Sequence, residues 1–155
     1  MPGIRTSYGI SPIIVERSSL MSAQVPGGWR LVAAETAHVV FAVEPVGNLR
    51  GYIQQKARAQ GFSNVYPVDG LITDLPFPAG FADITMGAHV FGSKPDEEYR
   101  EMKRVTTPGG MLILCPGTSP KENEAHIYLL SQGFSCAEFE EPTEGIKRKY
   151  WKQMV

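Results

Sequence analysis

Two acidic residues stand directly after two short apolar segments that we interpret as strands: Glu44 follows 38–43 and Asp69 follows 65–68. The carboxyl ends of parallel strands meet at one edge of a sheet, where open α/β proteins bind their ligands. A carboxylate at such an edge can accept hydrogen bonds from both hydroxyl groups of a ribose. The alternatives are a solvated loop carboxylate at Glu44 and an ordinary turn aspartate before glycine at Asp69.

A histidine follows the next predicted strand, 82–86, and is the best candidate for proton transfer. The imidazole of His89 can take up or release a proton near neutral pH, as a general base must. The alternative is a histidine that is bound to the backbone or half exposed. His38, at the start of a strand, and His126, on a helix, are interpreted as structural. The spacing of His, Cys, Asp and Glu residues matches no metal motif, so no metal site is expected.

Strands and helices of about ten residues alternate along the chain from residue 38 onward. The expected strands are 38–43, 65–68, 82–86 and 111–115, and the expected helices are 48–60, 96–105 and 122–132. The last two strands, 134–139 and 146–154, are joined by a link too short for a helix, which favours an antiparallel hairpin. We predict an α/β fold, with a Rossmann-like, mostly parallel sheet of about six or seven strands and helices on both faces.

The composition is that of an ordinary globular protein. The chain has 155 residues, 43% of them hydrophobic and 20% charged, and its formal net charge is -1. We therefore expect one domain over 1–155, in the cytoplasm, with neither a membrane nor a nucleic acid as partner. Cys115 and Cys136 are interpreted as buried thiols in neighbouring strands. The N-terminal part, 1–37, is atypical: 10–15 is an expected strand and 30–37 an expected helix.

Several short motifs stand in a familiar order from residue 43 onward. They are Val43-Glu44-Pro45, Val68-Asp69-Gly70, the stretch Leu75-Pro76-Phe77-Pro78 with Phe81-Ala82-Asp83-Ile84, and the turn from Arg104 to Gly110 (RVTTPGG). In this order the sequence resembles the class I S-adenosylmethionine (SAM) methyltransferases, especially their small-molecule branch. The resemblance implies a methyltransferase with SAM as cofactor and a small molecule as substrate.

The resemblance also assigns roles to single residues. Glu44 would bind the ribose, and Asp69 and Gly70 would meet the adenine. Leu71 would pack on the adenine face, although an ordinary core leucine is an equal alternative. His89 would face the methyl group as a base. A methyltransferase fold that binds or regulates without catalysis stays open as an alternative, and a nicotinamide-binding enzyme is a more distant one.

The chain departs from the family at the glycine-rich loop that should hold the cofactor. The best candidate is Gly27-Gly28, but Val25 and Trp29 occupy the outer glycine positions of the family pattern. A second candidate, the stretch Gly3 to Gly9, lies far from Glu44. Three explanations remain open: weaker SAM binding, a non-catalytic relative, or an N-terminal part that is not the native start. Because no helices would cover the mouth of the pocket, we expect a homo-oligomer.

Overall fold

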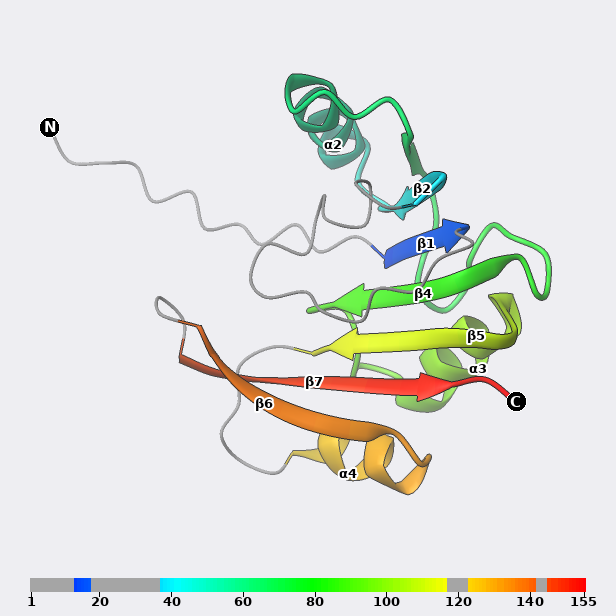
Figure 1. The fold of residues 1–155 in the computed structure, drawn as a ribbon, viewed down its shortest axis with the longest axis vertical. Coiled ribbons are helices and arrows are strands. Elements are labelled where there is room, and N and C mark those ends of the chain that lie inside the picture. The colour runs from blue at the N-terminus through cyan, green and yellow to red at the C-terminus, as the bar shows by residue number, and fades with distance from the viewer. Residues whose placement is uncertain (1–12, 18–36, 117–122, 142–144) are drawn as a thin grey trace, which may run out of the picture.

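A seven-stranded sheet with the order β3-β2-β1-β4-β5-β7-β6 organises the protein (Figure 1). The computed structural model describes residues 13–17, 37–116, 123–141 and 145–155. Its elements are β1 (Ile13–Arg17), β2 (Val39–Val43), α2 (Gly47–Ala59), β3 (Val65–Val68), β4 (Ala82–Ala88), α3 (Pro95–Val105), β5 (Thr106–Cys115), α4 (Glu124–Ser131), β6 (Ser135–Glu141) and β7 (Gly145–Gln153).

The sheet is mixed, so the expectation of a mostly parallel sheet is wrong. Strand β1 runs antiparallel to both of its neighbours, β2 and β4. Among the described strands, parallel pairing joins β2 to β3 and β4 to β5. In Figure 1 the arrows of β4 and β5 point one way and those of β1 and β7 the other. A parallel β1–β2 pair needs a crossover connection, whereas an antiparallel pair needs none. Residues 30–36 lie outside the described residues, and Ala37 is not helical.

The C-terminal hairpin has the predicted form. Strands β6 and β7 pair antiparallel from Ser135↔Trp151 to Glu141↔Gly145. Strand β7 then pairs antiparallel with β5 and therefore lies between β5 and β6. This order corrects the expectation for the two cysteines: Cys115 on β5 is buried, but Cys136 on β6 is only half-buried, and their strands are not neighbours.

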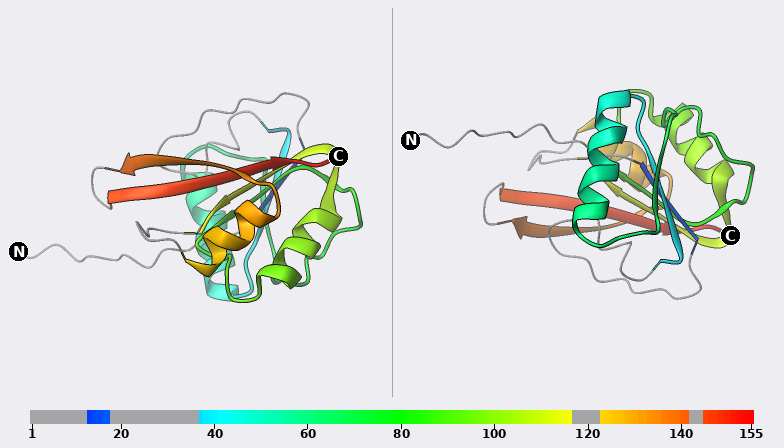
Figure 2. Two further views of the ribbon diagram at one scale, coloured as in Figure 1. Left: turned by 90° about the horizontal axis from the view of Figure 1, so that it is seen from below. Right: turned by 90° about the horizontal axis from the view of Figure 1, so that it is seen from above.

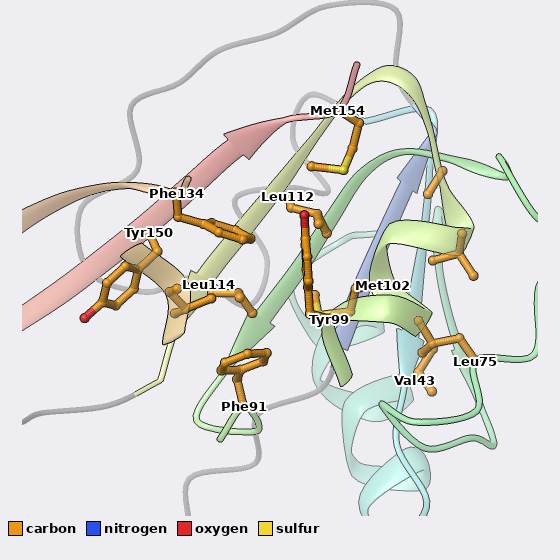
Figure 3. Close-up of a cluster of buried hydrophobic side chains, with 13 residues drawn as sticks. Val43, Leu75, Phe91, Tyr99, Met102, Leu112, Leu114, Phe134, Tyr150 and Met154 are labelled. Carbon is orange, nitrogen blue, oxygen red and sulfur yellow. The ribbon is translucent and has the colours of Figure 1, made fainter. Parts of the chain in front are cut away.

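Two apolar clusters on opposite faces of the sheet hold the helices in place. Leu112 and Leu114 of β5 belong to one cluster, whereas the intervening Ile113 packs against the other. The first cluster takes Met102 of α3 and Leu129 of α4, together with aromatic side chains from the loops and β7 (Figure 3). Successive side chains of a strand point to opposite faces of the sheet. The two clusters therefore lie on opposite faces, and the helices that pack on them cover both.

Helix α2 closes the second face and stands apart from the other two helices. It packs Ala57 and Ile53 against Val40 and Val65 of the neighbouring strands. Figure 2 shows α3 and α4 side by side against the same part of the sheet, away from α2.

Helix α3 begins and ends where its sequence favours it. Pro95 stands at its first turn, where the fixed φ suits a helix and the missing N–H is no loss. Three acidic residues fill the first turn and Lys103 and Arg104 the last, in keeping with the helix dipole. The residues predicted to face inward, Tyr99, Met102 and Val105, are buried. None of the described helices is long and apolar enough to cross a membrane.

Candidate functional site

The parallel pair of β2 and β3 brings two of the predicted site residues together. Val43 is in register with Val68, and the next residues along each strand are Glu44 and Asp69. The backbone N–H of Glu44 donates to the carbonyl oxygen of Val68 at 2.9 Å, which extends the pairing to the strand ends. The two carboxylates therefore follow neighbouring strands at one edge of the sheet, as the sequence predicted.

The Glu44 carboxylate is a buried acceptor. The residue is 7% exposed, and its Oε1 accepts a hydrogen bond from the backbone N–H of Val46 at 2.9 Å. No residue in the described ranges donates to Oε2. Burial of a charged oxygen is costly unless a donor reaches it, because folding strips it of water. This acceptor therefore fits a ligand that donates from hydroxyl groups, as a ribose does.

Arg50 connects the ends of β2 and β3, and the sequence reasoning missed it. Its Nη1 donates to the carbonyl oxygens of Glu44 at 2.8 Å and Pro45 at 2.9 Å, and to Oδ1 of Asp69 at 3.0 Å. A cation in the first turn of a helix is unfavourable for the dipole unless it has another partner. The position of Arg50 near the start of α2 was therefore an available signal.

Asp69 and the two residues after it form the outer wall of this edge. The Asp69 side chain is 72% exposed and pairs with Arg50. A Cβ on Gly70 would lie 2.7 Å from Cδ of Pro76 and 2.9 Å from Cγ1 of Val43, so packing of the loop against β2 already requires glycine. Leu71 is 53% exposed and pairs with Asp74 in a short bridge, so it is no core leucine. An exposed apolar side chain here is compatible with contact to a flat base.

His89 follows β4 in an unusual backbone conformation. Its φ is 57°, the left-handed region that few non-glycine residues occupy. Its backbone N–H donates to the carbonyl oxygen of Cys115 at 2.9 Å, which ties it to the end of β5. The residue is exposed, so a ligand can reach it. Strand β1 lies between β2 and β4, so His89 and Glu44 sit at the ends of strands separated by one strand.

A buried carboxylate that the sequence reasoning missed holds the loop after His89. Glu98 is 1% exposed, and its two oxygens accept from the backbone N–H groups of Gly92 at 2.7 Å and Lys94 at 2.8 Å. The signal was present, because Glu98 stands four residues before Met102 on the inward face of the predicted helix. The loop that carries His89 is therefore fixed at both ends.

The proline-containing loop before β4 is also held by α3. Glu101 accepts from the backbone N–H of Leu75 at 2.9 Å, and Arg104 donates to the carbonyl oxygens of Leu75 at 3.1 Å and Phe77 at 2.8 Å. The hydrogen bond from Arg104 lowers the pKa of the Glu101 carboxyl, although partial burial opposes this shift. These contacts join the motifs around Leu75 and Arg104 in the fold.

The remaining cofactor candidates cannot be placed. Gly27 and Gly28, with Val25 and Trp29, lie outside the described residues, as does the stretch Gly3 to Gly9. Their role in binding therefore stays a prediction. Within the described ranges, no group of three His, Cys, Asp or Glu side chains is placed to hold a metal ion.

Known proteins resemble parts of the chain. A demethylmenaquinone methyltransferase from Geobacillus kaustophilus (strain HTA426) is 32% identical over 100 residues, which cover 59% of this chain and 42% of the relative. The protein of the same name from Geobacillus stearothermophilus is 31% identical over the same shares of both chains. The chain thus spans under half the length of these curated relatives.

Solved structures share the fold at low sequence identity. A SAM-dependent methyltransferase from Aquifex aeolicus matches with a TM-score of 0.56 at 18% identity, over 74% of this chain and 68% of that one. The [4+2]-cyclase SpnF matches with a TM-score of 0.63 at 15% identity, over 79% and 68%. These likenesses establish an α/β Rossmann-like fold. Residues 25–114, more than half of the chain, match the family model of the methyltransferase domain, so the chain belongs to the class I SAM-dependent methyltransferase family, whose cofactor is S-adenosylmethionine.

Proposed function

We propose that this protein is a cytoplasmic SAM-dependent methyltransferase that acts on a small molecule. The observation that carries the proposal is the buried Glu44 carboxylate, whose Oε2 lacks a donor in the described ranges at the edge where α/β folds bind nucleotides. Two hydroxyl groups of a ribose are the donors that such an acceptor needs.

Different residues at this edge would bind different parts of SAM. Glu44 accepts from the ribose, while Asp69, Gly70 and Leu71 border the base. When bound, SAM supplies an electrophilic methyl group on a sulfonium. His89 holds a proton-accepting nitrogen near the end of β4 and would remove the proton of an acceptor that needs activation. The fixed loop around His89 lowers the cost of orienting it.

The methyl acceptor is inferred from the relatives. The relatives from Geobacillus are demethylmenaquinone methyltransferases, so demethylmenaquinone is the first substrate to test. Association into a homo-oligomer remains part of the proposal, and light scattering measures it directly.

Two substitutions of Glu44 test the proposal. Glu44→Ala removes the acceptor, and we expect SAM binding to weaken by about 1–3 kcal/mol, the range for hydrogen bonds to charged groups. Glu44→Gln keeps one oxygen for the N–H of Val46 but turns the other position into a donor. It should weaken binding similarly while leaving the melting temperature nearly unchanged. Isothermal titration calorimetry with SAM measures both constants.

The outcomes separate binding from folding. A Glu44→Gln protein that keeps both its melting temperature and its SAM affinity would show that Glu44 is not a ligand group. Glu97→Ala, on the exposed side of α3, serves as a control that should bind SAM like the unchanged protein.

A second candidate is a binding or regulatory module without catalysis. The antiparallel β1 favours it, because β1 ends at Arg17 beside Val39, at the edge of the sheet opposite to Glu44. The family's glycine loop follows a strand that ends at the ligand edge. The cyclase SpnF also illustrates that the fold serves other chemistry. SAM binding with no methyl transfer to demethylmenaquinone or other small acceptors would favour this candidate.

A further inference from the structure

We propose that Arg50 is a positioning residue that makes the site select a 6-aminopurine, by fixing the Asp69 carboxylate beside the base. This inference rests on the proposed function, because it assumes that the edge next to Glu44 holds the adenosine part of the cofactor. It adds a positioning residue, Arg50, to the adenine contact that the resemblance already assigns to Asp69.

Three hydrogen bonds fix the position of the Arg50 guanidinium. One nitrogen, Nη1, lies within 3.0 Å of three acceptors: the carbonyl oxygens of Glu44 and Pro45, and Oδ1 of Asp69. The two carbonyls belong to the turn between β2 and α2, and Asp69 belongs to the end of β3. The guanidinium therefore connects the turn after β2 to the end of β3 through a single nitrogen atom.

Position rather than stability is what this contact provides. The Asp69 side chain is 72% exposed, and exposed ion pairs contribute little to folding. However, the Arg50 side chain is only 27% exposed and is anchored on two backbone carbonyls, so it presents a fixed partner to the carboxylate. An exposed aspartate without such a partner samples several rotamers, at an entropic cost when a ligand binds.

The two carboxylates also need a cation between their strands. Glu44 and Asp69 follow residues that are in register, so two negative charges occupy adjacent strand ends. Like charges at neighbouring positions repel each other. Arg50 places a positive charge beside one of them, at 3.0 Å from Oδ1 of Asp69.

Selectivity for adenine over hypoxanthine follows from Oδ2 of Asp69, the carboxylate oxygen that Arg50 does not bind. With Oδ1 on Arg50, Oδ2 of Asp69 can accept from a ligand, and a carboxylate oxygen only accepts. The 6-amino group of adenine donates to it. The 6-carbonyl of hypoxanthine would place oxygen against oxygen, which a site of this kind rejects.

Binding of S-adenosylhomocysteine and S-inosylhomocysteine to the full chain tests the inference by calorimetry. The unchanged protein should prefer the adenosyl ligand by about tenfold or more. Arg50→Met keeps the apolar stem and should reduce this preference to about threefold or less, since Asp69 is then free to rotate. Arg50→Lys keeps the charge without the fork and should fall between the two. Arg58→Met, an exposed arginine on the same helix, is the matched control and should keep the full preference.

Each outcome decides a different question. If Arg50→Met weakens both ligands equally, or leaves the ratio unchanged, Arg50 has only a structural role and the inference is wrong. If the unchanged protein binds neither ligand, the proposed function fails and takes this inference with it. If Asp69→Asn abolishes the preference and Arg50→Met adds nothing further to it, the two residues act together as proposed.

Discussion

Glu98 is a carboxylate that the fold buries beside the loop after β4. Its oxygens accept from the backbone N–H groups of Gly92 and Lys94, at 2.7 and 2.8 Å. Glu98→Ala leaves both donors without this acceptor, so we expect the free energy of unfolding to fall by about 1–3 kcal/mol. Urea denaturation followed by circular dichroism measures the change. The neighbouring Glu97 makes an exposed ion pair with Lys94, and Glu97→Ala should change stability by less than about 0.5 kcal/mol. Equal losses in the two variants would contradict this account.

At the residue scale, the sequence predicted the acidic side chains that follow strands, but not the side chains that bind the backbone of loops. Glu44 and Asp69 could be placed because each directly follows an apolar strand, and the structure does put them at neighbouring strand ends. Arg50 was missed, although a cation in the first turn of a helix was a signal, because its three acceptors lie in the turn after β2 and at the end of β3 and meet only in the fold. Glu98 looked like one of several acids in a helix first turn, although its spacing matched the buried face.

Two glycine-to-alanine substitutions show that the same added methyl group can raise or lower stability, depending on the space around it. Gly51 lies inside α2 with nothing within 4 Å of an added Cβ, so Gly51→Ala should stabilise by about 0.5–1 kcal/mol through helix propensity. Gly110 lies in β5, where a Cβ would meet the carbonyl oxygens of Asp83 at 2.6 Å and Thr107 at 2.9 Å. Both are backbone atoms that cannot move without shifting β4 or β5. Gly110→Ala should therefore destabilise by about 2–3 kcal/mol. Chemical denaturation of both variants checks the opposite signs.

At the element scale, the prediction succeeded where periodicity is strong. The helix expected at 96–105 corresponds to α3, and most of the expected strands from 38 onward correspond to observed strands within a few residues. The exception is β5, which begins at Thr106 rather than at Met111, so Pro108-Gly109-Gly110 lies within a strand and not in the expected turn. Strand direction was harder, because the sequence of a strand such as β1 carries no sign of its orientation. Direction depends on the connection to the next strand, and the antiparallel β1 is what makes the expectation of a mostly parallel sheet wrong. The hairpin of β6 and β7 was predictable because its link is too short for a crossover.

The whole molecule depends on a core in which aromatic groups carry polar ends. Tyr150 of β7 belongs to the larger cluster, which α3, α4 and β5 share (Figure 3). Tyr128 of α4 packs against the same cluster. Tyr150 Oη lies 2.8 Å from Nδ1 of His126, which joins α4 to the sheet. The core is thus fixed by hydrogen bonds as well as by apolar area, and its stability should depend on the protonation of these phenols.

Alkaline pH should loosen this core between about pH 10 and 12. Burial raises the pKa of Tyr150 from 10.0 to about 12, with a smaller effect from Cys136, and burial together with Asp96 does the same for the pKa of Tyr128. The folded protein therefore retains these protons at a pH where the unfolded chain, whose phenols titrate near their ordinary pKa of about 10, has lost them. Their contribution to stability is complete below about pH 10 and disappears as the pH rises to about 12.

Urea denaturation at a series of pH values from about 9 to 12 measures this loss. Tyr150→Phe removes one of the two late-titrating groups, so its stability should start lower, because the hydrogen bond to His126 is gone, but fall less steeply with pH. Tyr52→Phe, on an exposed tyrosine of α2, leaves the buried phenols in place and should keep the slope of the unchanged protein. Lysines titrate in the same range in all three proteins, so the comparison of slopes isolates the phenols. If Tyr150→Phe loses stability as steeply as the unchanged protein, the phenol of Tyr150 does not keep its proton in the folded state, and the hydrogen-bonded core described above does not contribute in this way.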